Sequence, residues 1–393
     1  MAKRANRREP VADRVSRRWK FWEAITTERD AVVRRLVRFG YSIEWTNGPC
    51  PPCHCPNQPS AAQHGDFLDA YVADFISSGD IAAVPYRPHC VHPLGVIPKP
   101  RSTKLRPIPN MRSANAYMVA FRFDSLIDFA SIADREDVLI ALDMIQGYYH
   151  VALRPDSRTF AGFQWRNTYY VYNVLAPFGM STAPRCFAKV MGVLVRHWRA
   201  AGIRMLAYLD DWLFILRPPD VARVSARILA DCLAARVAIN REKSQLTPVR
   251  ELIHLGFEID MPRNRFCVPE ARWSTLQECI TELLRKRWAS AREIYAIAGR
   301  VISMALALGP AATLFTRCMY SRGTSAVSWD TPRPIPETVI DELHFWRSNP
   351  RLRYTSTIWH AEEQAVPVYI SDKGWGATIL VPRSGPPAHG FSY

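Results

Sequence analysis

The stretch that decides the fold is Ala207-Tyr-Leu-Asp-Asp-Trp-Leu-Phe214, in which two adjacent carboxylates interrupt a run of apolar residues. The run extends from Ile203 to Leu216 on both sides of Asp210 and Asp211. This pattern predicts a β-hairpin whose turn carries both acids. A typical Asp-Asp pair is an ordinary surface turn, but carboxylates at the ends of apolar strands are costly unless a positive charge compensates them. We therefore expect a chemical role for this pair.

A third carboxylate lies at the end of another apolar run, Val138 to Leu142, which is followed by Asp143. Helical spacing from 181 to 200 and from 220 to 237, together with a last strand over 252–259, completes a strand, helix, hairpin, helix, strand order. This order is a βαββαβ arrangement, in which the first strand and the hairpin can lie side by side. The three carboxylates would then converge, and such a set of oxygen ligands suits Mg²⁺ or Mn²⁺. Two such ions, about 4 Å apart, promote phosphoryl transfer.

The composition indicates a folded, basic protein. The chain has 393 residues, of which 48% are hydrophobic and 22% charged, and its net charge is +15. This length predicts two to four domains, and the apolar content excludes a wholly disordered chain. The basic excess, most of it arginine, favours partners that carry phosphate. With neither a membrane-length apolar run nor an export signal beside nine cysteines, we expect no membrane association and reduced thiols in the cytoplasm, the nucleus or both.

Five segments in order resemble the motifs of reverse transcriptases. Tyr208-Leu-Asp-Asp211 is similar to their Tyr-x-Asp-Asp box, and Asp143-Met-Ile-Gln-Gly-Tyr-Tyr-His150 resembles their first catalytic motif. The other three are Leu175-Ala-Pro-Phe-Gly-Met-Ser-Thr-Ala-Pro-Arg-Cys-Phe187, Ile239-Asn-Arg-Glu-Lys243 and His254-Leu-Gly-Phe257. Any one of them alone is a weak signal, but their order over about residues 90–260 is specific. Within the family, the run 298–303, with 311–320 and 342–346, resembles the tyrosine-recombinase (DIRS-like) retroelements.

The resemblance implies an α+β fold of the right-hand polymerase type, with fingers, a βαββαβ palm and a helical thumb. It places the fingers at 61–135, the palm at 136–262 with a finger insertion at about 150–178, the thumb at 263–325 and a connection at 326–365. Residues 1–60 precede these as a basic N-terminal helix, expected over Val15 to Phe39, and a Pro- and Cys-rich linker. That helix either packs on the next domain or contacts a nucleic-acid backbone.

The resemblance also assigns a catalytic group. Asp143 and Asp210 would be the main ligands of two Mg²⁺ (or Mn²⁺) ions, with Asp211 supporting them and the backbone carbonyl of Met144 as a further ligand. Lys243 matches a lysine that protonates the departing pyrophosphate; considered alone, it would be a surface lysine.

Other residues would contact the substrates. The resemblance assigns the incoming nucleotide to Lys99 and Arg106 on the two strands 94–97 and 104–108, to Tyr148 and to Phe178-Gly179. The ring of Tyr148 would exclude a ribose 2′-OH, although a core tyrosine is the plainer interpretation. Residues assigned to the template and primer are Arg112, Tyr208, His254, Leu255 and Gly256.

The implied activity is RNA-directed DNA polymerisation with an RNA template, a DNA primer and dNTPs. The sequence indicates neither a protein partner nor a dimer. A catalytically silent, retroelement-derived nucleic-acid-binding protein is the alternative, but the intact aspartates and Tyr148 oppose it. An RNA-dependent RNA polymerase is a third possibility, which Tyr148 and Leu209 oppose because that class favours a small or polar sugar gate and a glycine in the Asp-Asp box.

Two further segments carry possible metal ligands. Cys50, Cys53, His54 and Cys55 invite a zinc interpretation, with His89, Cys90 or His92 closing the site. Their spacing fits no standard zinc module and prolines surround them, so we expect an exposed linker with no tight zinc site.

The run Val368-Tyr-Ile-Ser-Asp-Lys-Gly-Trp-Gly-Ala377 resembles the first strand of a ribonuclease H domain, with a strand expected over 366–370. No Asp or Glu follows Asp372, and its register departs from that family. We expect residues 366–393 to be a truncated start of that fold, with Asp372 as a turn residue and no cleavage of RNA in a hybrid.

Overall fold

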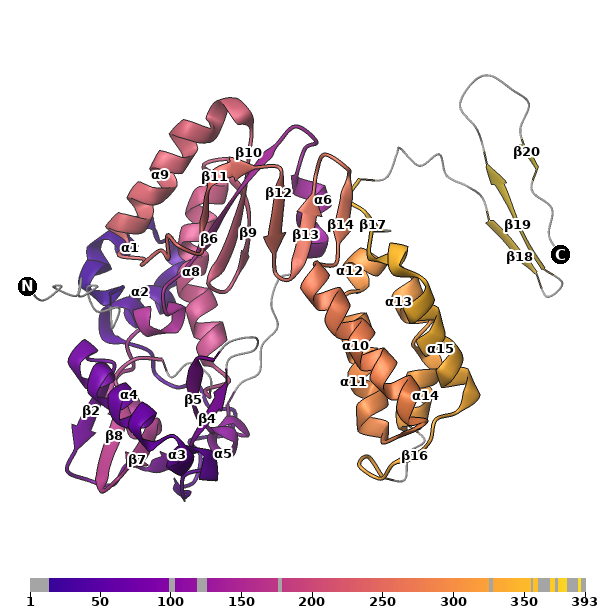
Figure 1. The fold of residues 1–393 in the computed structure, drawn as a ribbon. Coiled ribbons are helices and arrows are strands. Elements are labelled where there is room, and N and C mark those ends of the chain that lie inside the picture. The colour runs from indigo at the N-terminus through magenta and orange to yellow at the C-terminus, as the bar shows by residue number, and fades with distance from the viewer. Residues whose placement is uncertain are drawn as a thin grey trace, which may run out of the picture. The chain divides into compact units, whose positions relative to one another are not determined.

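A computed structural model describes residues 14–98, 103–118, 126–175, 179–324, 328–354, 356–359, 368–371, 374–379 and 388–389. The chain divides into two compact units, one up to Arg250 and one from Glu251 onward. Figure 1 shows both. This division falls inside the range 136–262 that the sequence assigns to the palm, and the predicted domain boundaries remain predictions.

The centre of the first unit is a four-stranded antiparallel sheet in the order β11-β6-β10-β9. Its strands are β6 (Val138–Asp143), β9 (Arg204–Tyr208), β10 (Asp211–Leu216) and β11 (Gln245–Val249). With α8 (Ala183–Ala200) and α9 (Val221–Ala234) between them, they confirm the predicted βαββαβ order. The last strand was misassigned, however: it is β11, and the predicted strand over 252–259 is instead a separate hairpin in the second unit.

Aromatic side chains fill the space between this sheet and α8. The Trp198 ring of α8 lies 5.2 Å from Trp212 and 5.4 Å from Phe214 of β10, both edge to face. All three rings are fully buried. The Trp198 indole N–H donates a 2.8 Å hydrogen bond to the carboxylate of Asp231 in α9, so one side chain joins both helices to the sheet. Helix α8 begins without a side-chain cap, because the Thr182 hydroxyl donates to the Met118 sulfur instead.

A second sheet, five-stranded, has the order β1-β3-β7-β8-β2. Its strands are β1 (Cys53–His54), β2 (Ile81–Val84), β3 (Cys90–His92), β7 (Gly162–Trp165) and β8 (Thr168–Tyr172). The predicted exposed linker is therefore wrong in part, because Cys53 and His54 form a strand and Cys50 is buried. The two strands predicted around the 98–102 turn form the hairpin β4 (Leu94–Pro98) and β5 (Leu105–Pro109). The remaining elements of this region are α3 (Pro59–Gln63), α4 (Gly65–Ser78), α5 (Arg112–Asn115), η3 (Leu126–Asp128), α6 (Phe129–Ile132), η4 (Gly147–His150), α7 (Pro155–Arg158) and η5 (Pro218–Asp220).

The N-terminal segment is helical but interrupted. It consists of η1 (Ser16–Arg18), α1 (Trp19–Ile25), η2 (Glu28–Asp30) and α2 (Ala31–Phe39). The single helix predicted over 15–39 is wrong, because Thr26 is extended and Thr27 begins a new turn with Asp30 in a capping box. Trp22 is buried and its indole N–H donates to the Ala235 carbonyl. The apolar face of this segment thus packs on the first unit, as one of the two interpretations expects.

The second unit opens with a four-stranded sheet in the order β12-β13-β14-β17. Its strands are β12 (Glu251–His254), β13 (Phe257–Asp260), β14 (Arg265–Cys267) and β17 (Ser356–Thr357). The β12–β13 turn has Leu255 and Gly256 at positive φ, and the Arg272 guanidinium donates to the Gly256 carbonyl at 2.6 Å. This agrees with the turn that the family resemblance implies at His254 to Phe257.

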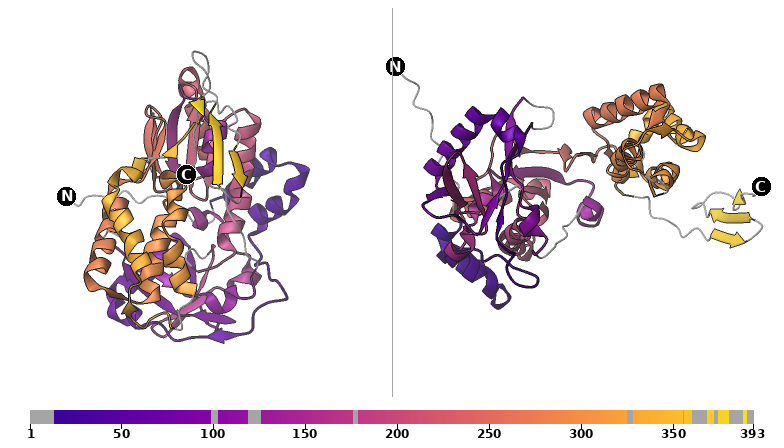
Figure 2. Two further views of the ribbon diagram at one scale, coloured as in Figure 1. Left: turned by 90° about the vertical axis from the view of Figure 1, so that its right-hand side faces the viewer. Right: turned by 90° about the horizontal axis from the view of Figure 1, so that it is seen from below.

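Helices make up most of the rest of the second unit, and Figure 2 shows them from two further sides. They are α10 (Glu270–Lys286), α11 (Ala291–Ile302), α12 (Ala305–Leu308), α13 (Ala311–Leu314), α14 (Arg317–Thr324), α15 (Glu337–Ser348) and η6 (Pro350–Tyr354), with short strands β15 (Trp288–Ala289) and β16 (Arg333–Pro334). Ser290 caps α11 in a capping box with Glu293, and α12 ends before Gly309.

Three further strands follow: β18 (Val368–Ser371), β19 (Gly374–Ile379) and β20 (Ala388–His389). They pair antiparallel in that order. Asp372 lies outside the described residues, so its predicted role as a turn residue is not tested. Among the helices that the structure describes, none has the length and apolar character needed to cross a membrane.

The packing of Trp198 predicts a large loss of stability on truncation. We expect Trp198→Ala to lower the free energy of unfolding by about 3–5 kcal/mol, because it removes a buried ring and leaves a cavity. Leu233→Ala, on α9 where the side chain is 77% exposed, should change it by about 0.5 kcal/mol or less. Urea unfolding followed by circular dichroism measures both. A loss below about 1 kcal/mol for Trp198→Ala would contradict this packing.

Candidate active site

The turn between β9 and β10 holds the Asp pair at the edge of the first sheet. Strand β9 ends at Tyr208, Leu209 adopts a left-handed conformation with φ of 53°, and β10 begins at Asp211. The buried Trp212 indole N–H donates a 3.1 Å hydrogen bond to the Leu209 carbonyl. The turn is therefore fixed by a side chain from within the apolar core.

Pairing of β6 with β10 brings the third carboxylate to the same edge. Asp143 is directly opposite Asp211 in the antiparallel register. Opposite residues of an antiparallel pair project from the same face, so these carboxylates are neighbours. The Met144 N–H donates to the Asp210 carbonyl at 3.1 Å, which ties the residue after Asp143 to the turn. The structure thus brings together the aspartates that the sequence predicts.

The segment after α9 supports Asp143 from its other side. The Asn240 N–H donates to the Asp143 carbonyl at 2.8 Å, and the Asp143 N–H donates to the Ser244 hydroxyl at 3.0 Å. Lys243 places its Nζ 3.7 Å from Oδ2 of Asp143 while most of its side chain stays exposed. The predicted lysine is therefore beside the acids. Ser244 was not predicted, because a serine that accepts one backbone N–H leaves no pattern in the sequence.

The site carries an excess of negative charge. Burial, with a smaller contribution from the Asp143 carboxylate, raises the pKa of Asp210 above its usual range. Burial and then the charges of Asp210 and Asp143 raise the pKa of Asp211 from 3.8 to about 6. Oδ1 of Asp143 is buried and has no hydrogen-bond partner among the described residues. One lysine does not balance three acids here, so the site favours an added cation.

The chemical type of the ligand atoms at this site suits a hard divalent cation. The site offers carboxylate oxygens, including the unpartnered Oδ1 of Asp143, and Mg²⁺ prefers oxygen ligands. Not all pairs of carboxylate oxygens from the three aspartates lie within 4.8 Å of one another. Within the described part of the chain, the ligand atoms of two thiol-imidazole clusters do lie that close together.

Tyr148 stands beside the acids on η4. Its ring centroid is 5.4 Å from that of Phe187 on α8, and burial followed by the charge of Asp210 raises its pKa to about 12. Gly147 precedes it, where a Cβ would come within 3.0 Å of Asp210 Cβ and 3.1 Å of the Phe187 ring. A Cβ at this position would displace the aspartate or the ring by a few tenths of an ångström, so glycine suits this turn.

His150 holds the same turn in place, a role that the sequence did not reveal. The Ala238 N–H donates to Nε2 of His150 at 2.9 Å, so Nδ1 carries the proton that His150 donates to the Gly147 carbonyl at 2.9 Å. The ring is fully buried, and burial lowers its pKa to about 4. His150 is therefore a neutral positioning residue. A histidine that follows two tyrosines has no sequence pattern that marks it as a positioning residue.

A second group of predicted residues gathers near Gly179. A Cβ at Gly179 would lie 2.5 Å from the Pro109 carbonyl at the end of β5, which carries Arg106. The Asn115 side chain donates to the Gly179 carbonyl at 2.6 Å and accepts from the Ser181 N–H at 2.9 Å. Asn115, which the sequence did not indicate, thereby links α5 to the start of α8. Arg112, predicted to contact the template, is exposed at the first position of α5.

Five predicted residues lie either outside the described residues or in the second unit. Lys99 and Phe178 lie outside the described residues. His254 and the Leu255-Gly256 turn belong to the second unit, where His254 is buried with Nε2 unpartnered among the described residues. Their roles remain predictions. Tyr208 does lie at the site, since it pairs with Asp211 across the hairpin.

Comparisons with known proteins identify the class of this site. Residues 97–259 match the family model described as "Reverse transcriptase (RNA-dependent DNA polymerase)". The first unit's sheet, its acids and its Gly179 contact lie inside this range. This segment is therefore similar to reverse transcriptases, in agreement with the predicted motifs.

Viral polymerases are among the similar curated proteins. Protein P of duck hepatitis B virus (strain United States/DHBV-16) is 29% identical over 156 residues, which cover 38% of this chain and 18% of that protein. A putative enzymatic polyprotein of cassava vein mosaic virus is 27% identical over 119 residues, or 30% of this chain and 18% of that protein. The chain thus matches less than a fifth of the length of these relatives.

Solved structures show the same fold. The foamy viral protease-reverse transcriptase in complex with dsDNA has a TM-score of 0.65 at 15% identity, covering 95% of this chain and 80% of that one. The same protein with an RNA/DNA hybrid has a TM-score of 0.64 at 14% identity, covering 95% of this chain and 52% of that one. The fold is that of a right-hand polymerase.

The crowded carboxylates predict a stability that depends on pH. With its pKa raised to about 6, Asp211 binds a proton more tightly in the folded chain, so its contribution is most favourable below about pH 4 and is lost as pH rises through 6. In chelator at pH 8, Asp211→Asn should therefore stabilise the fold by about 1–2 kcal/mol. The advantage should disappear near pH 4.

Thermal unfolding at both pH values tests this expectation. Asp74→Asn, an exposed change on α4, is the control and should have no pH-dependent effect. An Asp211→Asn chain that is less stable than the parent at pH 8 would show that the carboxylate is already neutralised within the protein.

Proposed function

We propose that this chain is an RNA-directed DNA polymerase that extends a DNA primer with dNTPs on an RNA or DNA template. The observation that carries the proposal is the pairing of Asp143 with Asp211, beside Asp210 in the adjoining turn. Three acids at the end of a buried sheet, on a reverse transcriptase fold, suit phosphoryl transfer between nucleotides. The family match over 97–259 supports the same reaction.

Two Mg²⁺ ions, or Mn²⁺, are proposed as the cofactors. When bound, they would activate the primer hydroxyl and stabilise charge on the transferred phosphate. Asp143 and Asp210 would hold them, with Asp211 and the Met144 carbonyl in support. The unpartnered Oδ1 of Asp143 and the raised pKa of Asp210 are both expected for acids whose negative charge a bound cation would compensate.

The other residues have proposed roles in binding and proton transfer. Lys243 would donate a proton to the departing pyrophosphate, and its Nζ, 3.7 Å from Asp143 with the side chain mostly exposed, supports this role. Arg106, with Lys99 and the Phe178-Gly179 segment, would bind the incoming nucleotide. Arg112, Tyr208 and the turn at His254, Leu255 and Gly256 would contact template and primer. The basic composition suits such partners.

The finer parts of the resemblance are also proposals. The chain would derive from a retroelement of the tyrosine-recombinase (DIRS-like) type and act in the cytoplasm, the nucleus or both. Relatives in hepadnaviral and plant viral polyproteins support a retroelement origin in general terms.

Loss of one metal ligand should abolish extension. We expect Asp143→Asn or Asp210→Asn to lower the rate by about 10³-fold or more, which corresponds to about 4 kcal/mol of transition-state stabilisation. The measurement is extension of a primed RNA template with dNTPs and Mg²⁺. Asp74→Asn provides an unaffected control. Extension by Asp210→Asn at the parent rate would exclude this assignment, and no extension by the parent would favour the silent nucleic-acid-binding alternative.

Tyr148 should select against ribonucleotides by steric exclusion. Tyr148→Ala should admit rNTPs while leaving dNTP use largely intact, whereas Tyr148→Phe should resemble the parent because the ring does the excluding. The ratio of dNTP to rNTP incorporation in single-nucleotide extension measures this selectivity. The same ratio in the parent and the alanine variant would remove Tyr148 from the sugar gate.

A further inference from the structure

Three cysteines and a histidine from distant parts of the sequence meet in the five-stranded sheet. Strand β1 runs parallel to β3, with Cys53 paired to Cys90. Paired residues of adjacent strands share a face, and so do residues two apart on one strand. Cys53, Cys90 and His92 therefore project to the same side, and their ligand atoms all lie within 4.8 Å of one another.

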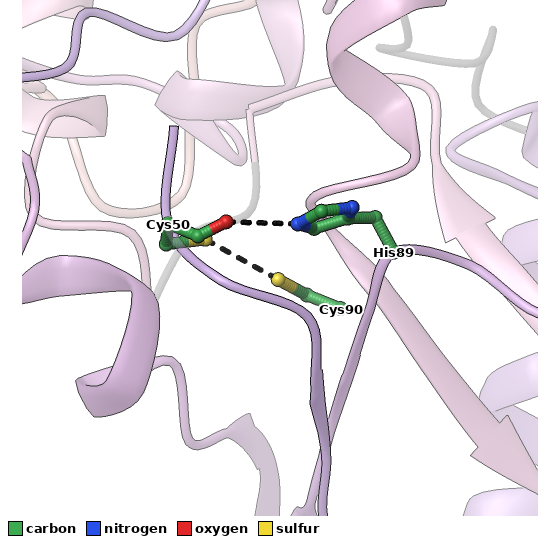
Figure 3. A group of neighbouring side chains, drawn as sticks. All are labelled: Cys50, His89 and Cys90. Atoms are coloured by element: carbon green, nitrogen blue, oxygen red, sulfur yellow. Dashed lines mark hydrogen bonds between the residues drawn. The ribbon is translucent and has the colours of Figure 1, made fainter. Parts of the chain in front are cut away.

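Cys50, in the segment that leads into β1, joins this group through Cys90, although no set of four ligand atoms in the described residues lies within 4.8 Å throughout. Its Sγ lies 3.4 Å from Sγ of Cys90, and the two thiols with His89 form a second group within 4.8 Å. Figure 3 shows Cys50, His89 and Cys90 facing one another. Sulfurs that bind one zinc at about 2.3 Å in tetrahedral geometry are about 3.8 Å apart, close to the observed separation.

The hydrogen bonds of His92 leave one ring nitrogen ready to bind a metal. Nε2 lies 2.9 Å from the Phe160 carbonyl, which can only accept, so Nε2 carries the proton. Nδ1 then has a free lone pair, and it is buried without a hydrogen-bond partner among the described residues. The side chain is 1% exposed. Donation from the second nitrogen to a backbone carbonyl is how metal-bound histidines are usually oriented.

His89 has a different role in this arrangement. Its Nε2 donates to the Cys50 carbonyl at 2.8 Å, as drawn in Figure 3, and its ring is only partly buried. It lies just before β3, which begins at Cys90. We treat it as a positioning residue that fixes the backbone of Cys50. The Ser113 hydroxyl, 3.4 Å from Sγ of Cys53, similarly donates to a proposed ligand.

We propose that Cys50, Cys53, Cys90 and Nδ1 of His92 bind one zinc ion. Three sulfurs and one imidazole nitrogen are a set that selects zinc, and four protein ligands close its tetrahedral shell. The site is therefore structural, joining the segment before β1 to β3. The sequence spacing pointed away from zinc because two of the ligands come from a strand almost 40 residues further on.

Metal analysis of the whole chain, purified in reductant without chelator, tests the proposal. We expect about one zinc per chain. Cys53→Ser, Cys90→Ser and His92→Ala should each lose most of it. The exposed neighbour Cys55→Ser, the buried Cys232→Ser on α9 and His89→Ala should retain it. Loss of zinc in His89→Ala with retention in His92→Ala would overturn the ligand set.

A second measurement avoids variants that fail to fold. Cobalt substituted into the parent chain should give the thiolate charge-transfer absorption of three sulfurs in tetrahedral geometry. Reduced parent protein with neither zinc nor this absorption would overturn the proposal. A Cys50–Cys90 disulfide found by mass spectrometry in the protein as purified would also overturn it.

Discussion

The antiparallel pairing of β6 with β10 is the interaction on which the candidate active site depends. Its register runs from Val138 opposite Leu216 to Asp143 opposite Asp211. Both strands are apolar at consecutive positions and β10 is buried on both faces, so close packing of these side chains fixes where the acids meet. Each fully buried Leu, Ile or Phe contributes about 1.5–3 kcal/mol, and several lie on these two strands. Together they exceed the cost of holding repelling carboxylates at the strand ends.

The surroundings of the acids are shaped mainly by backbone contacts from buried polar side chains. Trp212 donates to the turn that holds Asp210, His150 donates to the turn that holds Tyr148, and Ser244 accepts from the backbone of Asp143. Each of these hydrogen bonds restricts the conformation of one backbone segment without adding charge to the site. The site therefore combines a preorganised backbone with a local excess of negative charge, which is the combination that suits binding of divalent cations and phosphates.

The predictable parts of the structure were those with local signals. The Asp hairpin and α8 follow from apolar runs and a capped helical pattern, and their order gave the palm topology. The last palm strand was missed because β11 lies at the sheet edge, where Gln245, Thr247 and Pro248 are tolerated and no apolar pattern is needed. Asn115 and His150 could not be predicted because each acts on backbone groups far away along the chain.

The thiol cluster is a second case in which residues far apart in the sequence meet and the sequence pattern does not predict it. Strand β1 lies at an edge of its sheet and has two residues. A strand of this length is too short for ladder hydrogen bonds alone to hold it firmly. A closed four-ligand site would supply the missing restraint, because it ties Cys50 and Cys53 to a buried central strand. The carboxylates differ because they are hard oxygen ligands, which suit Mg²⁺ together with substrate phosphates. Strand pairing thus creates two kinds of cation site in one unit, one suited to holding the chain together and the other suited to chemistry.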